Sequence, residues 1–300
     1  MSGGDPSLVS DQTIHTGPGV VRRAAGIVQS KFEHAVRLLL VHYLSRYIPL
    51  VLVTEYPKSG GTWLGQLISG YLGIPFPRNR VPTPQRCLLH GHYRPSQHLS
   101  HIPGIVWLAR DGRDVMVSLY HQYLLWNDRN RLQPSAVLRY RKQLAFADYH
   151  DVRGNLPAFI GFVFTYAPSK LQHFTHPGTW ASFNRAWLEQ DCVPPASVLP
   201  TRYEALAAQP EQELTRVLGR LDSDPVASAK VAQVVAQYSF EAQTGRVPGE
   251  ERTSSFLRKG SVGDWRNFFN REAAEVFDHY AGDMLVTLGY EPDRGWVRRV

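Results

Sequence analysis

The segment Tyr-Pro-Lys-Ser-Gly-Gly-Thr-Trp at 56–63 combines the residue types that an anion-binding loop needs. It follows an apolar run of strand length and opens a stretch with helical periodicity. Its glycines allow backbone N–H groups to turn toward an anion, and the helix N-terminus adds partial positive charge. Lys58, Ser59 and Thr62 add side-chain donors. Lysine precedes the glycines here, whereas in a Walker A loop it follows them. The pattern therefore favours a phosphate-binding turn of another type over a simple strand–helix turn with Thr62 near the N-cap.

A second group of charged residues, Arg-Asp-Gly-Arg-Asp at 110–114, follows the apolar run at 105–109. Arg110 would lie at the carboxyl end of a strand, where ligands bind in open α/β sheets. Ser118 falls one helical turn further on, so Arg110 and Ser118 could together hold a phosphate. Taken alone, such a run is more often a salt-bridged turn.

A third basic segment lies near the C-terminus, where Phe-Leu-Arg-Lys-Gly at 256–260 precedes Ser-Val-Gly-Asp-Trp at 261–265. Adjacent cationic side chains followed by a Gly-Asp turn suit a loop that closes over an anion. The alternative is an ordinary basic surface loop.

The elements that must position these segments are visible as apolar patterns. Short β-branched or apolar runs predict strands at 50–55, 105–109 and 197–201. Apolar periodicity predicts helices at 30–45, 63–72, 115–125 and 212–221. Strands that alternate with helices, and that show little polar alternation themselves, indicate a parallel sheet covered on both faces. The chain is therefore predicted to be an α/β protein.

The three segments, taken together and in order, resemble the motifs of the cytosolic-type sulfotransferases, which use 3′-phosphoadenosine 5′-phosphosulfate (PAPS). The first motif of that family reads Tyr-Pro-Lys-Ser-Gly-Thr-Thr-Trp, so Gly61 replaces one threonine here. The third motif, Arg-Lys-Gly-x-x-Gly-Asp-Trp, is intact at 258–265. The resemblance extends over about 50–290. It implies a P-loop-like three-layer α/β/α fold with a central, mostly parallel sheet and an inserted helical lid region.

The resemblance also implies roles for individual residues. The first loop would wrap the 5′-phosphosulfate, with Trp63 near the adenine. Arg110 and Ser118 would bind the 3′-phosphate together with the third motif. Tyr203 and Phe240 match aromatic residues that contact the base. The implied donor-binding set is Lys58, Ser59, Gly60, Gly61, Thr62, Trp63, Arg110, Ser118, Tyr203, Phe240, Phe256, Leu257, Arg258, Lys259 and Gly260.

The general base implied by the resemblance is a histidine upstream of the second motif, in a Lys-Thr-His-x-x-Pro-like context. Leu-Leu-His-Gly-His-Tyr-Arg-Pro at 88–95 occupies that place, which makes His92 the base and His90 the alternative. Lys58 would stabilise the leaving oxygen, and Ser118 would hold Lys58 before the acceptor arrives. The scheme needs no metal, and no carboxylate or thiol follows the histidine pair at ligand spacing.

Composition narrows the class of protein. The 300 residues carry a formal net charge of +7, yet no run of five or six basic residues suggests a nucleic-acid-binding tail. Two cysteines exclude a disulfide framework or a cysteine-rich zinc site and favour a cytoplasmic location. The first 30 residues are predicted to be a flexible leader, and 31–300 a single domain. Within that domain the aromatic-rich region 126–180 is predicted to be an acceptor wall or lid, or else a set of extra packing helices.

Three alternatives stay open at this point. A nucleotide kinase would need a Gly-Lys-Thr/Ser order that is absent. A glycan or cell-envelope carbohydrate sulfotransferase of the membrane-anchored kind fits the intact third motif less well. A nucleic-acid-binding module would require a basic outer face. The acceptor is expected to be a small hydroxyl compound with an apolar or aromatic part. The oligomeric state is open, because the family's dimer motif is degraded at Asn270–Arg271.

Overall fold

A parallel β-sheet forms the centre of the molecule in the computed structural model. The structure describes residues 49–78, 85–132, 134–166, 176–222 and 224–300, together with 36, 39, 41, 43, 46 and 47. Within these residues the sheet has four strands in the order β2–β1–β3–β4. Leu52 of β1 is paired with Leu89 of β2 and with Ile105 of β3. The strands are β1 (Leu50–Glu55), β2 (Cys87–Gly91), β3 (Gly104–Ala109) and β4 (Val198–Arg202).

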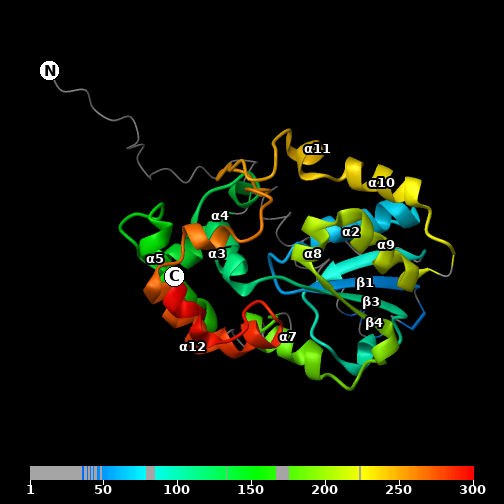
Figure 1. The fold of residues 1–300 in the computed structure, drawn as a ribbon, viewed down its shortest axis with the longest axis horizontal. Helices are drawn as coiled ribbons and strands as arrows, with labels where there is room; N and C mark the ends of the chain where they lie inside the picture. The colour runs from blue at the N-terminus through cyan, green and yellow to red at the C-terminus, as the bar shows by residue number, and fades with distance from the viewer. Residues whose placement is uncertain are drawn as a thin grey trace.

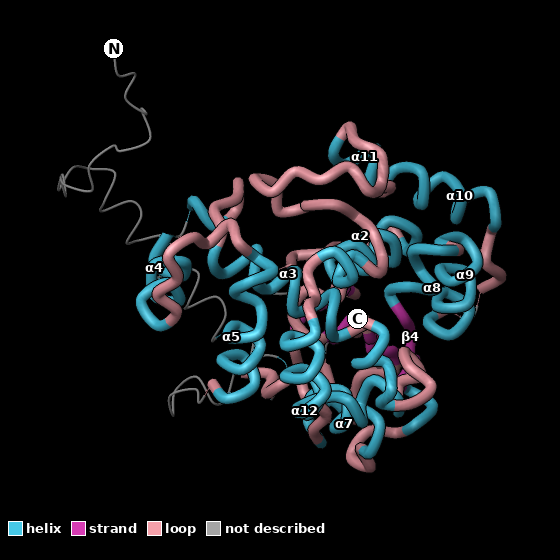
Figure 2. The backbone as a smooth tube through the Cα atoms, turned by 60° about the vertical axis from the view of Figure 1, so that its left-hand side comes forward, coloured by secondary structure: helices cyan, strands magenta, loops and turns pink. Residues whose placement is uncertain are grey.

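Helices cover both faces of this sheet (Figure 1). One face packs against α2 (Gly61–Leu72), α8 (Tyr203–Ala208), α9 (Pro210–Leu221) and α10 (Ser228–Gln237). The other packs against α3 (Gly112–Leu124), α5 (Val152–Thr165), α7 (Trp180–Glu189) and α12 (Arg271–Thr287). Figure 2 shows β4 between α8 on one side and α7 on the other. The shorter elements are α4 (Pro134–Gln143), α11 (Phe240–Thr244), η1 (Gln97–Leu99), η2 (Asn130–Leu132), η3 (Pro195–Ser197), η4 (Asp264–Asn267) and η5 (Arg294–Arg299).

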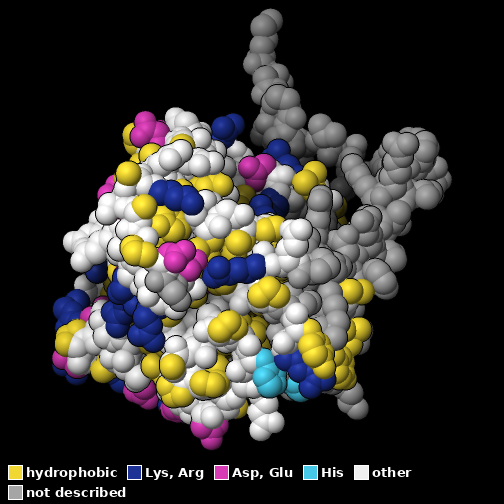
Figure 3. All heavy atoms as spheres, turned by 90° about the vertical axis from the view of Figure 1, so that its right-hand side faces the viewer, with side chains coloured by type: hydrophobic (Ala, Val, Ile, Leu, Met, Phe, Trp, Pro, Cys, Tyr) yellow, Lys and Arg dark blue, Asp and Glu magenta, His cyan; other side chains and the backbone are white. Residues whose placement is uncertain are grey.

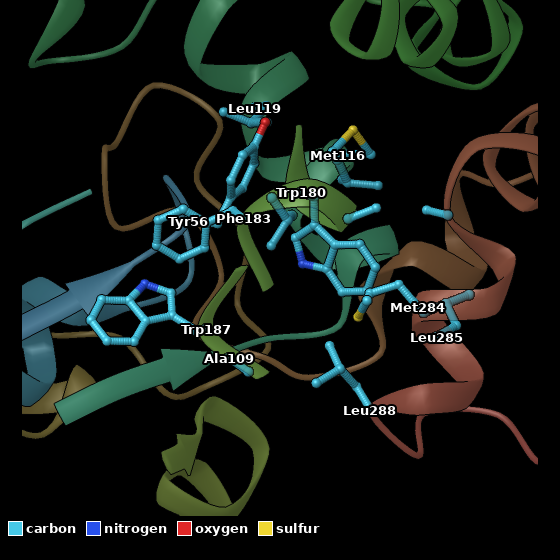
Figure 4. Close-up of a cluster of buried hydrophobic side chains, with 14 of the residues drawn as sticks. Tyr56, Ala109, Met116, Leu119, Trp180, Phe183, Trp187, Met284, Leu285 and Leu288 are labelled. Carbon is cyan, nitrogen blue, oxygen red and sulfur yellow. The ribbon is translucent and has the colours of Figure 1, made fainter. Parts of the chain in front are cut away.

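Alternation along the strands divides the core in two. Successive strand side chains point to opposite faces, so Val51 and Val53 pack toward α2 while Leu50 and Leu52 pack toward the α3 side. The core cluster on the α3 side is rich in aromatic rings, and Figure 4 shows part of it. There Tyr56 lies against Phe183 of α7, with ring centroids 6.0 Å apart. A sheet buried on both faces explains why its strands read as continuous apolar runs.

The predicted three-layer α/β/α architecture is confirmed by the two core clusters and the parallel strand order. The predicted strands and the helices at 63–72, 115–125 and 212–221 are present, and their ends differ from the prediction by at most three residues. Strand β2 was not predicted, because Leu88-Leu89-His90-Gly91 is short and polar at its end. The predicted leader lies outside the described residues, as does most of the predicted helix at 30–45.

The carboxyl edge of the sheet gathers the segments that the sequence singled out. Because all four strands are parallel, their carboxyl ends lie on one edge. The loop before α2 follows strand β1. His92 follows β2, Arg110 follows β3, and Tyr203 follows β4. Residues that are up to 150 positions apart in sequence are thereby brought to one edge, which is the usual ligand side of an open α/β sheet.

Candidate active site

The loop between β1 and α2 has the backbone of an anion-binding turn. Lys58 has φ 73° and Gly60 has φ 103°, so both are in the left-handed region. The left-handed conformation is rare for a residue with a side chain, and proteins keep such strained residues mostly at ligand-binding turns and active sites. Gly60 cannot be replaced at low cost, since a Cβ there would lie 2.6 Å from the Tyr203 ring. The loop then runs directly into the N-terminus of α2, where Thr62 and Trp63 are half-buried.

Glu55 links this loop to the histidine segment. Its carboxylate is buried at the end of β1 and accepts a hydrogen bond from the Gly61 backbone N–H. The other carboxylate oxygen lies 3.0 Å from His90 Nε2. A Cβ at Gly61 would lie 2.6 Å from that same nitrogen and 2.7 Å from Glu55 Cδ. The glycine that departs from the family motif therefore occupies the space next to a buried carboxylate–imidazole pair.

Burial and the two histidines shift the pKa of the Glu55 carboxyl group in opposite directions. Burial alone would raise the pKa of Glu55, but the hydrogen bond and positive charge of His90, with a smaller contribution from His92, lower it overall. The carboxylate is therefore ionised at neutral pH. Its negative charge lies next to the 56–63 loop, whose only charged side chain is the cationic Lys58.

The two candidate bases differ in their surroundings. The His90 side chain is 12% exposed and is engaged by Glu55, whereas His92 is exposed at the sheet edge. His92 Nδ1 lies 2.9 Å from the backbone oxygen of Glu55. A carbonyl oxygen only accepts, so Nδ1 carries the proton and Nε2 carries the lone pair in the neutral ring. The geometry thus provides His92 with a basic Nε2.

Arg110 joins the three sequence segments at one point. Its guanidinium donates to the backbone oxygens of Lys58, at 3.1 Å, and of Ser261, at 3.3 Å. It also forms an ion pair of 3.6 Å with Asp114 and lies 4.2 Å from the Tyr203 ring centroid. The aromatic ring that packs on Gly60 therefore also supports Arg110. Ser118, further along α3, is half-buried.

The third segment is folded around one carboxylate. Arg258 and Lys259 both donate to Asp264, Lys259 at 2.5 Å. Gly260 has φ 63°, and a Cβ there would lie 2.5 Å from the Phe240 ring. Phe240, which is expected to contact the base, therefore packs directly on the loop that is expected to bind the 3′-phosphate. Trp63 extends the aromatic wall, with its ring 6.1 Å from that of Tyr203.

Lys58 lies among cations and an aromatic ring. Its Nζ is 3.9 Å from the Phe256 ring centroid. Burial, together with the positive charges of Arg129 and Arg110, lowers the pKa of Lys58 to about 7. A lysine with this pKa is only partly charged at neutral pH, and an anionic ligand would favour its charged form. Phe256 and Leu257 are half-buried; the Leu257 backbone oxygen accepts from Arg246.

Four buried polar atoms of these segments have no hydrogen-bond partner among the described residues: Ser59 Oγ, Arg110 Nε, Ser261 Oγ and Trp265 Nε1. The first three lie in the loops around Lys58. Unsatisfied buried donors are costly and are uncommon in folded proteins. This donor set fits a ligand that carries several negative charges, and the neighbouring aromatic rings fit a base.

Sequence reasoning missed the acidic residues of the site. Glu55, Asp114 and Asp264 hold the cationic groups in place, and Glu204 accepts from the Asp111 backbone N–H at 2.9 Å. Glu55 could have been flagged as an acid at the end of a buried strand, directly before the loop. The role of Asp264 depends on a loop closing on itself, which no spacing rule reports.

Three further observations concern metal ligands, membrane spans and surface charge. Groups of three or more potential metal ligands are absent from the part of the chain that the structure describes. Among the same residues, no helix has the length and apolar character needed to cross a bilayer. On the face in Figure 3, Lys and Arg side chains lie in small separate groups interspersed with Asp and Glu, without a continuous basic stripe.

Comparisons with known proteins identify the family of this chain. A family model described as Sulfotransferase domain matches residues 89–288. Sulfotransferase 1B1 of Mus musculus is 26% identical over 269 residues, which cover 76% of this chain and 80% of that protein. Cytosolic sulfotransferase 12 of Arabidopsis thaliana is 26% identical over 271 residues, which cover 76% and 74%.

Solved structures show the same fold. The crystal structure of mouse sulfotransferase SULT7A1 complexed with PAP has a TM-score of 0.59 at 20% identity, covering 86% of this chain and 90% of that chain. A retinol dehydratase in complex with androsterone and inactive cofactor PAP has a TM-score of 0.55 at 17% identity, covering 84% and 85%. With a family model matched over most of its length and three motif segments gathered at one sheet edge, the chain belongs to the PAPS-dependent sulfotransferase family.

Proposed function

We propose that this protein transfers a sulfuryl group from PAPS to the hydroxyl of a small-molecule acceptor. The observation that carries the proposal is the position of Arg110, whose guanidinium touches the backbone of both the Lys58 loop and the Ser261 loop. Three segments that are far apart in sequence thereby form one cationic site. The relatives' printed names, and the PAP in the solved structures, support the choice of donor.

The donor would be held by complementary groups along the edge of the sheet. Residues 58–63 would bind the 5′-phosphosulfate through side-chain donors and through backbone N–H groups other than that of Gly61, which donates to Glu55. Ser59 Oγ, buried and without a partner among the described residues, would be one of the side-chain donors. Arg110, Ser118 and 258–260 would bind the 3′-phosphate, since Arg forks match phosphate geometry. The rings of Trp63, Tyr203 and Phe240 would contact the adenine.

Catalysis would depend on positioning and charge. When bound, PAPS supplies an activated sulfuryl group. His92 Nε2 accepts the proton of the acceptor hydroxyl, an acid–base contribution of typically about 10²–10⁴-fold. Lys58 donates to the bridging oxygen as charge develops there, which is the larger electrostatic contribution in group transfers of this type. Ser118 would orient Lys58 before the acceptor arrives.

The proposal extends to two features of the whole chain. Region 126–180 would form part of the acceptor wall, because Asp128 and Arg129 lie beside Phe256, the ring that contacts Lys58. A cytoplasmic location is proposed as well: Cys87 and Cys192 are both free, and one relative is named as cytosolic.

The test is calorimetric titration of the purified full chain with PAP and, separately, with ATP–Mg²⁺. PAP is expected to bind and ATP–Mg²⁺ to bind much more weakly, and labelled PAPS is expected to transfer its sulfuryl group within an acceptor panel. A glycan in the panel distinguishes the carbohydrate alternative. Tight binding of ATP–Mg²⁺ with none of PAP would overturn the proposal in favour of a kinase.

A further inference from the structure

A cavity of about 870 Å³ lies beside Phe256. Its walls come from three connections: the segment after α2 at 76–78, the segment after α3 at 128–132, and the loop at 243–257. The second and third walls are fixed to each other, since the Asp128 backbone N–H donates to Ser254 O at 2.8 Å and Asp128 Oδ1 accepts from the Phe256 N–H at 2.8 Å. The cavity is therefore built by tertiary contacts between loops.

Phe256 connects this cavity to the reacting centre. Lys58 Nζ lies 3.9 Å from the centroid of the Phe256 ring, and Arg129 Cζ lies 4.4 Å from the same centroid. Arg129 is also the largest charged contributor to the lowered pKa of Lys58, after burial. If the proposed function holds, an acceptor reaching Lys58 from this side passes Arg129.

The cavity carries an excess of positive charge. Arg78, Arg129, Arg246 and Arg252 line it, against the single carboxylate of Asp128. Arg246 has a structural role, because its guanidinium donates to the backbone oxygens of Glu250 and Arg258. Arg129 and Arg252 form no ion pair with a carboxylate among the described residues, in contrast to Arg258 and Lys259 of the donor loop.

Arg129 and Arg78 also repel each other. The pKa of Arg129 is lowered, first by burial and then by the positive charge of Arg78. Like charges held together in a cavity are stabilised by a bound anion, and the guanidinium fork matches a carboxylate or phosphate in a bidentate manner. Phe76 and Leu132 add apolar surface to the same cavity. The chemistry of the walls thus specifies a ligand with an anionic group on an apolar body.

We propose that the acceptor of this enzyme is a hydroxyl compound that also carries a carboxylate or phosphate, bound by Arg129 and Arg252 in the cavity beside Phe256. The proposal rests on the proposed function and adds the chemical class of the acceptor. It predicts that specificity comes from the loops at 128–132 and 243–257, while donor binding comes from the sheet edge.

The experiment compares ligands that differ only in charge. The PAP-saturated full chain is titrated with para-hydroxyphenylacetate, para-hydroxybenzylphosphonate and the uncharged para-hydroxyphenylacetamide. At least one anion is expected to bind about tenfold or more tightly than the amide, the effect of about one charge-assisted hydrogen bond. The carboxylate and phosphonate arms show which anion is preferred. Equal binding of all three, or no binding of either anion at millimolar concentration, overturns the proposal.

Variants locate the effect. Arg129→Gln and Arg252→Gln are expected to remove most of the preference for the anion and to leave the affinity for PAP within about twofold. Arg271→Gln, which changes an exposed arginine outside this cavity, is the matched control and is expected to bind like the wild type. If Arg129→Gln and Arg252→Gln weaken PAP instead, the cations serve the donor and the proposal is wrong. Failure of PAP to bind the wild type would instead contradict the proposed function.

Discussion

At the scale of single residues, Glu55, Gly61 and His90 form one coupled unit. The Glu55 carboxylate bonds both the Gly61 N–H and His90 Nε2, and a side chain at Gly61 would collide with both partners. Gly61 and His90 are therefore structurally coupled, because a threonine at 61 would collide with the imidazole. The Gly61 N–H, expected to face the donor, is directed to Glu55 in this structure.

Gly61→Thr, which restores the family motif, is expected to destabilise the protein by about 1–3 kcal/mol, the usual cost of overpacking. Removing the imidazole in Gly61→Thr/His90→Ala opens space and should recover part of that loss, giving non-additive free energies of unfolding. Denaturant unfolding of the four proteins of this cycle measures the coupling. Strict additivity would mean that Gly61 and His90 are independent.

His92→Ala is expected to lower turnover by about 10²–10⁴-fold while leaving PAP affinity unchanged, because the imidazole acts on the acceptor proton. His90→Ala is the matched comparison, since His90 is held by Glu55 behind the loop. Single-turnover sulfuryl transfer and PAP titration measure the two effects. Full turnover in His92→Ala with loss in His90→Ala would assign the base to His90.

Lys58 gives donor binding a pH dependence. Its pKa is lowered to about 7, so above pH 7 the free protein loses the charge that an anion requires. PAP favours the charged form, so binding takes up a proton, and affinity should fall by up to about tenfold per pH unit above 7. Calorimetry from pH 6 to 9 in buffers of different ionisation enthalpy measures both effects. Lys58→Met should bind PAP weakly with little pH dependence, and an unchanged slope in this variant would assign the proton elsewhere.

At the scale of elements, the N-terminus of α3 depends on a buried arginine. Arg113 donates to Asp111, which caps the helix, and to Glu291 at 2.5 Å. Its guanidinium lies 3.8 Å from the Trp265 ring centroid and 4.8 Å from that of Trp296. The second motif therefore has two roles. Arg110 faces the site, and Arg113 fastens the helix to the C-terminal segment.

Arg113→Met is expected to destabilise the protein by about 3–5 kcal/mol, because it leaves the partly buried carboxylates of Asp111 and Glu291 without their cation. Arg271→Met, which breaks an exposed pair with Glu275, should cost about 0–1 kcal/mol. Denaturant midpoints at fixed m-value compare the two. Equal losses would show that Arg113 contributes no more than a surface charge.

At the scale of the whole molecule, the site lies where two separately packed cores meet. One core joins the sheet to α2, α8, α9 and α10, and the other joins it to α3, α5, α7 and α12. Arg110 and Tyr203 bring loops from both sides to one edge. A ligand bound there contacts several loops at once and should stabilise the folded state as a whole.

PAP at about 100 times its dissociation constant is expected to stabilise the fold by about 2.7 kcal/mol, which corresponds to several degrees in Tm. Arg110→Met should lose most of this shift, because it removes the group that joins the three segments. Differential scanning calorimetry with and without PAP measures the shift within each protein. A full shift in Arg110→Met would contradict the central place given to Arg110.

The sequence by itself determined the parallel α/β architecture and the three motif segments, because buried parallel strands read as apolar runs and ligand loops carry their own glycines and cations. It could not supply β2, whose Leu88-Leu89 run is too short to stand out, or the contacts of Glu55 and Asp264. Glu55 acts on His90, 35 positions further along the chain, and Asp264 acts through the folding of its own loop back onto Arg258 and Lys259. Only the tertiary structure decided which cations are neutralised at the donor loops and which are left to line the cavity beside Phe256, since ion pairing depends on distances in space.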